Sequence, residues 1–333
     1  MSAIANISII GGGAWGTALA QVLAQAGRKV TLYARDAGLA DIINTTHENK
    51  TYLAGAPLDK SIRATADIAA AVKGAELVLL TTPAQHLRET LGKFAQHLPK
   101  GVPLVNTAKG IEVTTGFLLS EMAAEVAKGH PYAVLSGPTF AIDTVRGLPT
   151  AATLASTSND AHHWAEALRG ATFRPYLSSD PVGVEIAGAL KNVIAIACGI
   201  VEGKKFGQNA KAAVMTRGLA EIKRLGLKRG AQAETFLGLS GVGDLVLTCS
   251  SMTSRNFSLG FELGQGRKLE EIMAERRTVA EGVATAHAVA DYALKNSVDM
   301  PICMGVKMIL KGEAKVDEVV TGLLSRDIKA ENI

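Results

Sequence analysis

The stretch ISIIGGGAWG, from Ile7 to Gly16, joins a short β-branched run to a glycine-rich loop. Its glycines Gly11, Gly13 and Gly16 stand in the spacing G-x-G-x-x-G. In this pattern the first glycine permits a tight turn, the second lets the backbone approach a pyrophosphate, and the third allows close packing of helix on sheet. A helical stretch follows over 18–26, and its N-terminus offers free N–H groups and a positive dipole end to phosphates. Because the loop follows a strand and precedes a helix, it predicts a dinucleotide-binding site.

The residues after the next expected strand bear on the choice of dinucleotide. That strand, over 29–33, is followed by Ala34-Arg35-Asp36. An acidic residue here binds the ribose 2′-hydroxyl of NAD, whereas an arginine accommodates the 2′-phosphate of NADP. Arg35 stands nearer the strand end than Asp36, so we expect NADP(H), with use of NAD(H) kept open.

The first half of the chain alternates short apolar runs with helical patterns, and the second half is helical. Apolar strands separated by helices indicate a parallel sheet covered on both faces, and right-handed crossovers give a doubly wound fold. The strands are expected over 7–10, 29–33, 75–81, 102–107, 132–136 and 150–155. The later helices are expected over 182–201, 210–225, 258–276, 283–296, 302–311 and 316–328. The predicted fold class is an α/β Rossmann-type doubly wound domain over 1–180, followed by an all-α domain over 181–333.

Composition and charge exclude several classes of protein. The 333 residues include 35 Lys and Arg against 31 Asp and Glu, a net charge of +4, and the basic residues are scattered, so no nucleic-acid partner is expected. The three cysteines lie far apart without metal-ligand spacing, which predicts no metal and fits a reducing compartment. No apolar run reaches the ~18 residues of a membrane span, and the N-terminus lacks the basic head of a signal peptide. We therefore expect a cytoplasmic protein.

One lysine stands in an unusual setting. Lys191 lies inside the apolar helix expected over 182–201, and its neighbours three and four positions away are small or apolar. No acidic residue on that helix can pair with it locally. Desolvation lowers the pKa of such a lysine toward neutrality, which suits a general acid–base at a carbonyl/alcohol pair. Asp244, in the apolar run 241–248, is its expected long-range partner; the alternative is a lysine whose chain reaches solvent.

Two further segments carry groups that suit an anion. Lys109 follows an expected strand, so it lies at the carboxyl edge of the sheet, where ligands bind in open α/β folds. Ser254-Arg255-Asn256 supplies a hydroxyl, a guanidinium and an amide just before a helical segment. Such a helix N-terminus is a good phosphate site. Ordinary alternatives are an exposed loop lysine for Lys109 and simple N-capping for Ser254.

In their order along the chain, these motifs resemble those of the bacterial-type NAD(P)-dependent glycerol-3-phosphate dehydrogenases. The resemblance covers essentially the whole chain, and together its motifs are far more specific than the glycine loop alone. They are the segments 11–16, 109–110, 136–141, 190–193, 241–248, 254–256 and 279–282. The resemblance implies an N-terminal Rossmann domain and a helical substrate domain.

The resemblance also implies an oxidoreductase reaction and the residues that perform it. Dihydroxyacetone phosphate is reversibly reduced by NAD(P)H to sn-glycerol 3-phosphate, which feeds phospholipid synthesis, and Lys191 is the catalytic acid–base residue. The implied substrate contacts are Lys109, Gly137, Thr139, Lys191, Asp244, Ser254, Arg255 and Asn256. The implied cofactor contacts are Gly11, Gly13, Trp15, Gly16, Arg35, Lys109, Ala141, Arg255, Val279 and Glu281. A homodimer is kept open.

Two other functions fit part of the pattern. A 3-hydroxyacid dehydrogenase related to 6-phosphogluconate dehydrogenase would also pair a Rossmann domain with a lysine in a long helix, and residues 188–192 fit either family. The segments 241–248 and 254–256 favour the glycerol phosphate family. A non-catalytic dinucleotide sensor would bind the cofactor without turnover.

Overall fold

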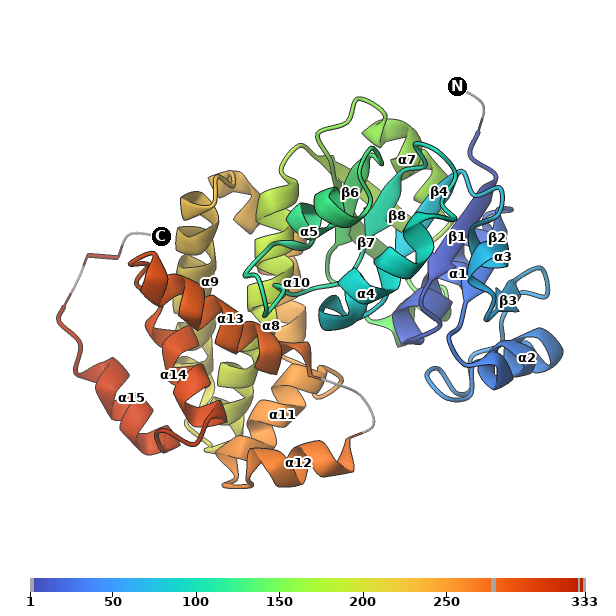
Figure 1. The fold of residues 1–333 in the computed structure, drawn as a ribbon. Coiled ribbons are helices and arrows are strands. Elements are labelled where there is room, and N and C mark those ends of the chain that lie inside the picture. Colours follow the sequence, from blue (N-terminus) through green and yellow to red (C-terminus); the bar gives the residue numbers. More distant parts are fainter. Residues whose placement is uncertain (1–2, 277–279, 329, 332–333) are drawn as a thin grey trace. The chain divides into compact units, whose positions relative to one another are not determined.

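The computed structural model describes residues 3–276, 280–328 and 330–331. The chain divides into two compact units (Figure 1). The sheet unit comprises Met1–Ala108 and Leu119–Pro181, and the helical unit comprises Lys109–Leu118 and Val182–Ile333. The segment Lys109–Leu118 therefore packs with the helices, although the expected boundary after residue 180 assigns it to the first domain.

The described part of the sheet unit contains an eight-stranded sheet with the order β3-β2-β1-β4-β5-β6-β7-β8. Its strands are β1 (Asn6–Ile10), β2 (Lys29–Tyr33), β3 (Arg63–Thr65), β4 (Leu77–Leu80), β5 (Leu104–Asn106), β6 (Tyr132–Ser136), β7 (Thr150–Ala155) and β8 (Phe173–Ser178). The order reverses between β1 and β4. In a doubly wound sheet this is the switch point outside which ligands bind, at the carboxyl ends of the strands.

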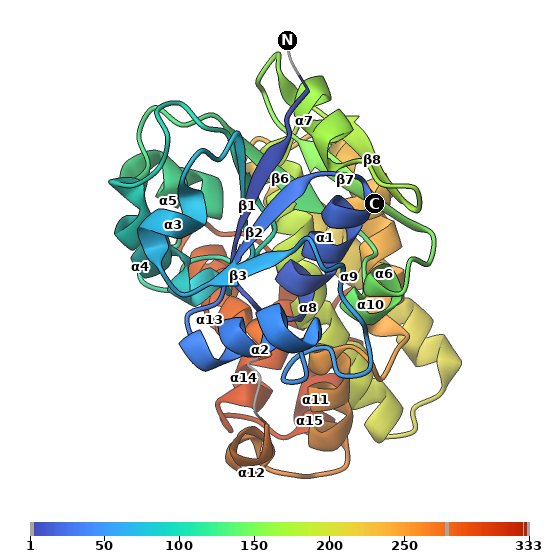
Figure 2. The same cartoon turned by 90° about the vertical axis from the view of Figure 1, so that its right-hand side faces the viewer.

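Helices cover both faces of the sheet. Neighbouring strand residues point to opposite sides, so one strand supplies apolar side chains to both faces. Ile7 and Ile9 of β1 belong to one apolar cluster, and Ile10 belongs to the other. Figure 2 shows α3, α4 and α5 on one side of β1 and β2, and α1 and α6 on the other. The helices of this unit are α1 (Ala14–Gln25), α2 (Ala37–Thr46), α3 (Ile68–Val72), α4 (Ala84–Ala95), α5 (Leu119–Val126), α6 (Ala141–Val145) and α7 (Ala161–Leu168). The predicted α/β class of this unit is confirmed.

Three details of the sheet differ from the prediction. β3 and β8 were not expected, because β3 has only three residues and β8 (FRPYLS) buries only Phe173 and contains a proline. The sheet is also not wholly parallel: β7 runs antiparallel to β6 and parallel to β8. An apolar run reports that a strand is buried and carries no information on its direction.

The helical unit is built around α8 (Pro181–Gly203), which is long and apolar enough to span a membrane by length and composition. It is the one such helix among the described residues, and Glu185 and Lys191 interrupt its apolar run. Of its most apolar window, 94% is buried inside the protein, as in the core helix of a globular fold. The remaining elements are α9 (Gln208–Lys228), η1 (Ala233–Leu237), η2 (Leu239–Gly243), α10 (Asp244–Cys249), α11 (Arg255–Gly264), α12 (Leu269–Glu275), α13 (Glu281–Lys295), α14 (Pro301–Leu310) and α15 (Val316–Leu324).

The helix expected over 258–276 is two helices, α11 and α12. The break follows from Gly266, whose φ of +90° lies in the left-handed region that favours glycine and ends a helix. Glycine is also required where α11 crosses α8, since a Cβ at Gly260 would lie 2.0 Å from the carbonyl oxygen of Ile196. This close crossing packs α11 against the helix that carries Lys191.

Candidate active site

Two lysines and one aspartate form a buried cluster in the helical unit. Lys191, which is 6% exposed, donates hydrogen bonds to Oδ1 of Asp244 and, at 2.8 Å, to Oγ1 of Thr248. The Nζ of Lys109 lies 2.7 Å from the other carboxylate oxygen, Oδ2 of Asp244. Each carboxylate oxygen of Asp244 thus accepts a hydrogen bond from one lysine ammonium group. The expected pairing of Lys191 with Asp244 is confirmed, and the alternative of a solvent-reaching Lys191 is wrong.

A tight glycine turn places Asp244 at this point. A Cβ at Gly241 would lie 2.1 Å from the carbonyl oxygen of Phe236, so only glycine lets the chain pass this close. The turn leads into α10, whose first residue is Asp244. Thr248 follows four residues later and therefore lies on the same helix face. Sequence reasoning did not single out Thr248, although its spacing from Asp244 was a usable signal.

The electrostatics of this cluster favour a lysine that can exchange a proton. Burial lowers the pKa of Lys191 to about 8; the charge of Asp244 opposes this effect, and that of Lys109 adds to it. Burial also raises the pKa of Asp244, but the two ammonium groups outweigh it and hold that pKa below its ordinary value. With two cations around one carboxylate, the cluster suits an anionic ligand.

The segment 254–256 forms the start of α11. The Oγ of Ser254 accepts a hydrogen bond from the backbone N–H of Phe257 at 3.2 Å, so Ser254 is the N-cap. Asn256 is 8% exposed, and its Oδ1 accepts from the N–H of Gly282 at 2.9 Å, which leaves the amide Nδ2 without an acceptor among the described residues. The Arg255 side chain is exposed and makes no hydrogen bond or ion pair with a described residue. A hydroxyl, an amide and a guanidinium therefore share one helix end.

The glycine loop of the sheet unit follows β1 at the switch point. Gly11 has a φ of +132°, a conformation that non-glycine residues rarely adopt. A Cβ at Gly16 would lie 2.0 Å from the carbonyl oxygen of Gly11, so this glycine permits the close approach of α1. A Cβ at Gly13 would meet no atom within 4 Å, which leaves this backbone open to a ligand. Trp15 is half-buried in the first turn of α1.

The two charged residues after β2 have different surroundings. Asp36 is the N-cap of α2, and its Oδ1 accepts from the N–H groups of Gly38 at 2.9 Å and Leu39 at 3.4 Å. Arg35 is exposed. The hydrogen bonds of Asp36 therefore give it a structural role as a helix cap.

The remaining expected contacts lie after β6 and at α13. A Cβ at Gly137 would be 2.9 Å from Cα of Ala152, and Oγ1 of Thr139 donates to the carbonyl of Gly137 at 3.3 Å. Ala141 is the half-buried first residue of α6, and Glu281 is the first residue of α13. Val279 lies outside the described residues. The glycine loop, Arg35 and Gly137 follow β1, β2 and β6, which are parallel, so all three stand at the carboxyl edge of the sheet.

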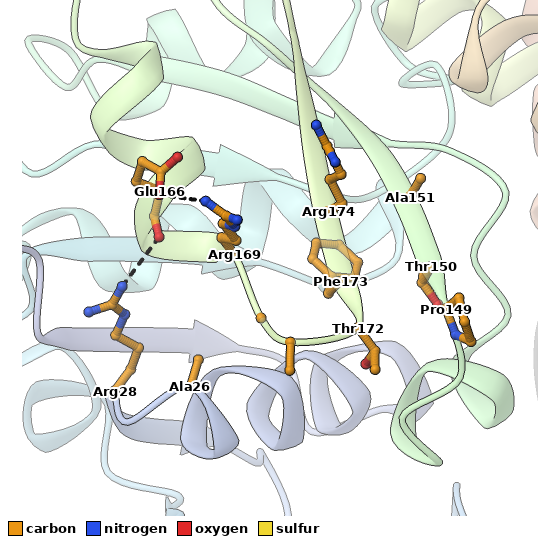
Figure 3. Close-up of a pocket in the computed structure, with 12 residues that line it drawn as sticks. Ala26, Arg28, Pro149, Thr150, Ala151, Glu166, Arg169, Thr172, Phe173 and Arg174 are labelled. Carbon is orange, nitrogen blue, oxygen red and sulfur yellow. Dashed lines mark hydrogen bonds and ion pairs between the residues drawn. The ribbon is translucent and has the colours of Figure 1, made fainter.

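A cavity of about 730 Å³ in the sheet unit contains none of the expected site residues (Figure 3). Two of its cations are already engaged: Arg28 donates to the carbonyl oxygen of Glu166 at 3.2 Å, and Arg169 lies 3.6 Å from the Glu166 carboxylate. Figure 3 shows both side chains directed at Glu166, whereas Arg174 points away from them. The polar groups of this cavity do not converge on a common point, and we do not assign the reaction to it.

The doubly wound sheet with its glycine loop, and the helical unit with its buried lysine cluster, define a nicotinamide-dependent dehydrogenase built from two kinds of domain. Residues 6–162 match the family described as NAD-dependent glycerol-3-phosphate dehydrogenase N-terminus, and residues 180–321 match its C-terminus. The chain belongs to the NAD-dependent glycerol-3-phosphate dehydrogenase family.

Individual relatives agree with this assignment. The chain is 54% identical over 330 residues to glycerol-3-phosphate dehydrogenase [NAD(P)+] of Parvibaculum lavamentivorans, with 98% of each chain covered. It is 53% identical to the enzyme of the same name from Rhodospirillum rubrum, with 98% of this chain and 94% of the relative covered. The crystal structure of glycerol-3-phosphate dehydrogenase from Coxiella burnetii is similar, with a TM-score of 0.93, 36% identity, and 97% and 99% of the two chains covered. The expected family and fold class are confirmed. The family that matches is that of the glycerol-3-phosphate dehydrogenases and not the alternative related to 6-phosphogluconate dehydrogenase.

Proposed function

We propose that this chain reduces dihydroxyacetone phosphate reversibly to sn-glycerol 3-phosphate with NAD(P)H, and that Lys191 is its acid–base residue. The observation that carries the proposal is the buried pairing of Lys191 with Asp244, in a chain of this dehydrogenase family. A lysine with a pKa of about 8 can hold a proton at neutral pH and release it during the reaction.

The residues of the sheet unit fit a dinucleotide. The open side of Gly13 and the close approach at Gly16 suit a pyrophosphate at the start of α1. When bound, the nicotinamide supplies the hydride, and the protein has to bind, orient and supply a proton. We assign dinucleotide contacts to Gly11, Gly13, Trp15, Gly16, Arg35, Lys109, Ala141, Arg255, Val279 and Glu281. We also propose a domain division at residue 180, with a dinucleotide-binding Rossmann domain over residues 1–180 and a helical substrate-binding domain over 181–333.

Lys191 acts where charge develops during reduction. Negative charge grows on the carbonyl oxygen of the substrate, and the Lys191 ammonium stabilises it and then gives up the proton at Nζ. Asp244 and Thr248 orient the ammonium through the hydrogen bonds described above. Lys109 shares the charge of Asp244 and adds a second cation facing an anionic substrate.

The phosphate of the substrate is remote from the reacting carbon, and its binding fixes the geometry of that carbon. We assign this role to the start of α11, where Arg255 has an unpaired guanidinium among the described residues and Asn256 a donor in Nδ2. The proposed substrate contacts in full are Lys109, Gly137, Thr139, Lys191, Asp244, Ser254, Arg255 and Asn256.

We also propose that the product supplies phospholipid synthesis, that the enzyme works in the cytoplasm, and that it forms a homodimer.

Steady-state kinetics test the proposed reaction. Purified protein is mixed with NADPH or NADH and dihydroxyacetone phosphate, and the loss of reduced cofactor is followed by its absorbance. We expect oxidation of the cofactor that depends on dihydroxyacetone phosphate. Turnover with an oxoacid alone, or cofactor binding without turnover of either substrate, would contradict the proposal.

Replacement of Arg35 by alanine is expected to raise KM for NADPH about tenfold and to change KM for NADH less than about twofold. The reason is that a charge-assisted contact to the 2′-phosphate is worth ~1.5–3 kcal/mol, at the lower end for an exposed side chain. The measurement is KM for each cofactor at saturating dihydroxyacetone phosphate. Arg63→Ala is the matched control, because Arg63 is an exposed arginine at the start of β3, away from the carboxyl edge. Equal losses for the two cofactors would refute the role of Arg35.

A further inference from the structure

We propose that Asn49 and Thr81 are positioning residues for the cofactor. Each bonds a carbonyl group of the glycine loop and thereby aims the next backbone N–H at the dinucleotide pyrophosphate. The proposal rests on the proposed function, since it takes the loop as the cofactor site. Neither residue belongs to the motif by which the loop is recognised in a sequence.

Asn49 makes more than an ordinary loop contact. It lies between α2 and β3, and it is fully buried. Its Nδ2 donates to the carbonyl oxygen of Gly12 at 2.9 Å and to Oγ1 of Thr17 at 2.8 Å. Its Oδ1 accepts from the N–H of Tyr52 at 3.2 Å. Both amide hydrogens and the amide oxygen are used, so the side chain is held in one orientation between its own loop and the start of α1.

Thr81 makes the corresponding contact from another direction. It follows β4, the strand next to β1 across the switch point. Its Oγ1 lies 2.9 Å from the carbonyl oxygen of Gly11 and 3.1 Å from that of Ile10. The carbonyl groups of Gly11 and Gly12 are therefore each bonded by a side chain that comes from outside the loop.

Because of peptide geometry, these two contacts fix the direction of the backbone N–H groups of Gly12 and Gly13. The C=O and the N–H of one trans peptide plane point in opposite directions. A bond to the Gly12 carbonyl therefore sets the direction of the Gly13 N–H, and a bond to the Gly11 carbonyl sets that of the Gly12 N–H. Neither N–H donates to a described residue. With the open side of Gly13, two directed donors make a site for an anion.

Side chains from outside the loop are needed to fix the direction of these N–H groups, because glycine has little conformational preference of its own. The loop contains three successive glycines, Gly11 to Gly13, which can adopt many backbone conformations. Without the two tethers the loop would have to be ordered on binding, and that cost lowers affinity. The pyrophosphate is common to NADPH and NADH. Loss of a tether should therefore weaken both cofactors equally, unlike loss of Arg35.

Asn49→Ala tests the proposal, with Asn44→Ala as the matched control. Asn44 uses the same amide chemistry in the same unit: its Nδ2 donates to the carbonyl of Ala64 at 2.9 Å, and its Oδ1 accepts from the Ala64 N–H at 2.9 Å. It holds α2 to β3 and makes no contact with the glycine loop. Both variants are expected to lower the melting temperature. Only Asn49→Ala is expected to raise Kd for NADPH and NADH, by about tenfold each, because a buried donor to the loop is lost.

The measurements are Kd for each dinucleotide by titration calorimetry, and kcat and KM with dihydroxyacetone phosphate. We expect kcat at saturating cofactor, and KM for dihydroxyacetone phosphate, to stay within about twofold of the wild type. A folded Asn49→Ala protein with wild-type Kd for both cofactors would overturn the proposal, as would a loss confined to NADPH. If wild-type protein binds neither dinucleotide, the proposed function itself fails.

Thr81→Val supplies an independent test if Asn49→Ala does not fold. Valine has nearly the shape of threonine, so the substitution removes the hydroxyl donor to Gly11 and keeps most of the packing. We expect Kd to rise about fivefold for both NADPH and NADH, somewhat less than for Asn49→Ala, because Thr81 is only partly buried. Unchanged affinity for both cofactors in Thr81→Val would remove the positioning role.

Discussion

Replacement of Lys191 by alanine is expected to lower kcat about 10³-fold and to leave Kd for NADPH and NADH unchanged. The magnitude follows from the usual contribution of a positioned general acid, ~10²–10⁴. The variant should fold, because Asp244 keeps Lys109 as a counter-charge at 2.7 Å. The measurements are the rate of dihydroxyacetone phosphate reduction at saturating substrates and cofactor binding by titration.

Lys307→Ala is the control for the loss of a buried lysine as such. Lys307 lies on α14, in the same unit, is 9% exposed, and pairs with Asp291 at 2.6 Å. Its loss should cost stability without lowering kcat more than about twofold. Near wild-type kcat in Lys191→Ala, or an equal loss in Lys307→Ala, would remove Lys191 from the mechanism.

The second large effect is expected for Asp244→Asn. Without the carboxylate, burial and the charge of Lys109 both lower the pKa of Lys191, and nothing in the cluster opposes them. A smaller fraction of Lys191 is then protonated at pH 7, and reduction of dihydroxyacetone phosphate should fall about 100-fold, within the range of a lost general acid. Removing one partner of a buried ion pair also costs ~3–5 kcal/mol of stability, so melting temperatures must be measured alongside.

The pH dependence separates this electrostatic effect from a loss of structure. Reduction requires protonated Lys191, so in the wild type its rate should fall as pH rises through about 8, whereas oxidation of glycerol 3-phosphate requires the neutral amine and should rise through the same region. In Asp244→Asn both transitions should move to lower pH. Asp291→Asn removes the carboxylate partner of Lys307 and should move neither. Transitions at unchanged pH in Asp244→Asn would show that Asp244 does not control the charge of Lys191.

The site was predicted from patterns of residues that are close together in the sequence. These patterns were most informative where the same residues are also close together in the structure. The glycine spacing identifies the loop after β1 because each glycine has a steric reason that involves its own strand and helix. Lys191 stood out because no acidic residue lies three or four positions from it on its own helix, and its partner was inferred from a second charge in an apolar run. That Lys109 shares Asp244 could not be inferred, since this contact depends on how the segment Lys109–Leu118 packs with the helical unit.

Asn49 shows the opposite case. In the sequence it is one polar residue of a polar loop, and such residues are usually exposed. Only the path of the chain from α2 to β3 buries it against Gly12 and Thr17. The strands β3 and β8 were missed for a related reason, because their positions come from pairing with β2 and β7 and not from an apolar run of their own.

The amino-acid sequence alone therefore determined the class of fold, the glycine loop and the two buried charges Lys191 and Asp244, because spacing and hydrophobic pattern act over a few residues. The tertiary structure decided the direction of β7, the grouping of Lys109 with the helical unit, and the tethering of the glycine loop by Asn49 and Thr81. The tethers and the contact of Lys109 with Asp244 join residues that are 37 to 135 positions apart. The direction of β7 comes from its pairing with β6, in which Ser136 lies opposite Thr153. No local pattern encodes such contacts.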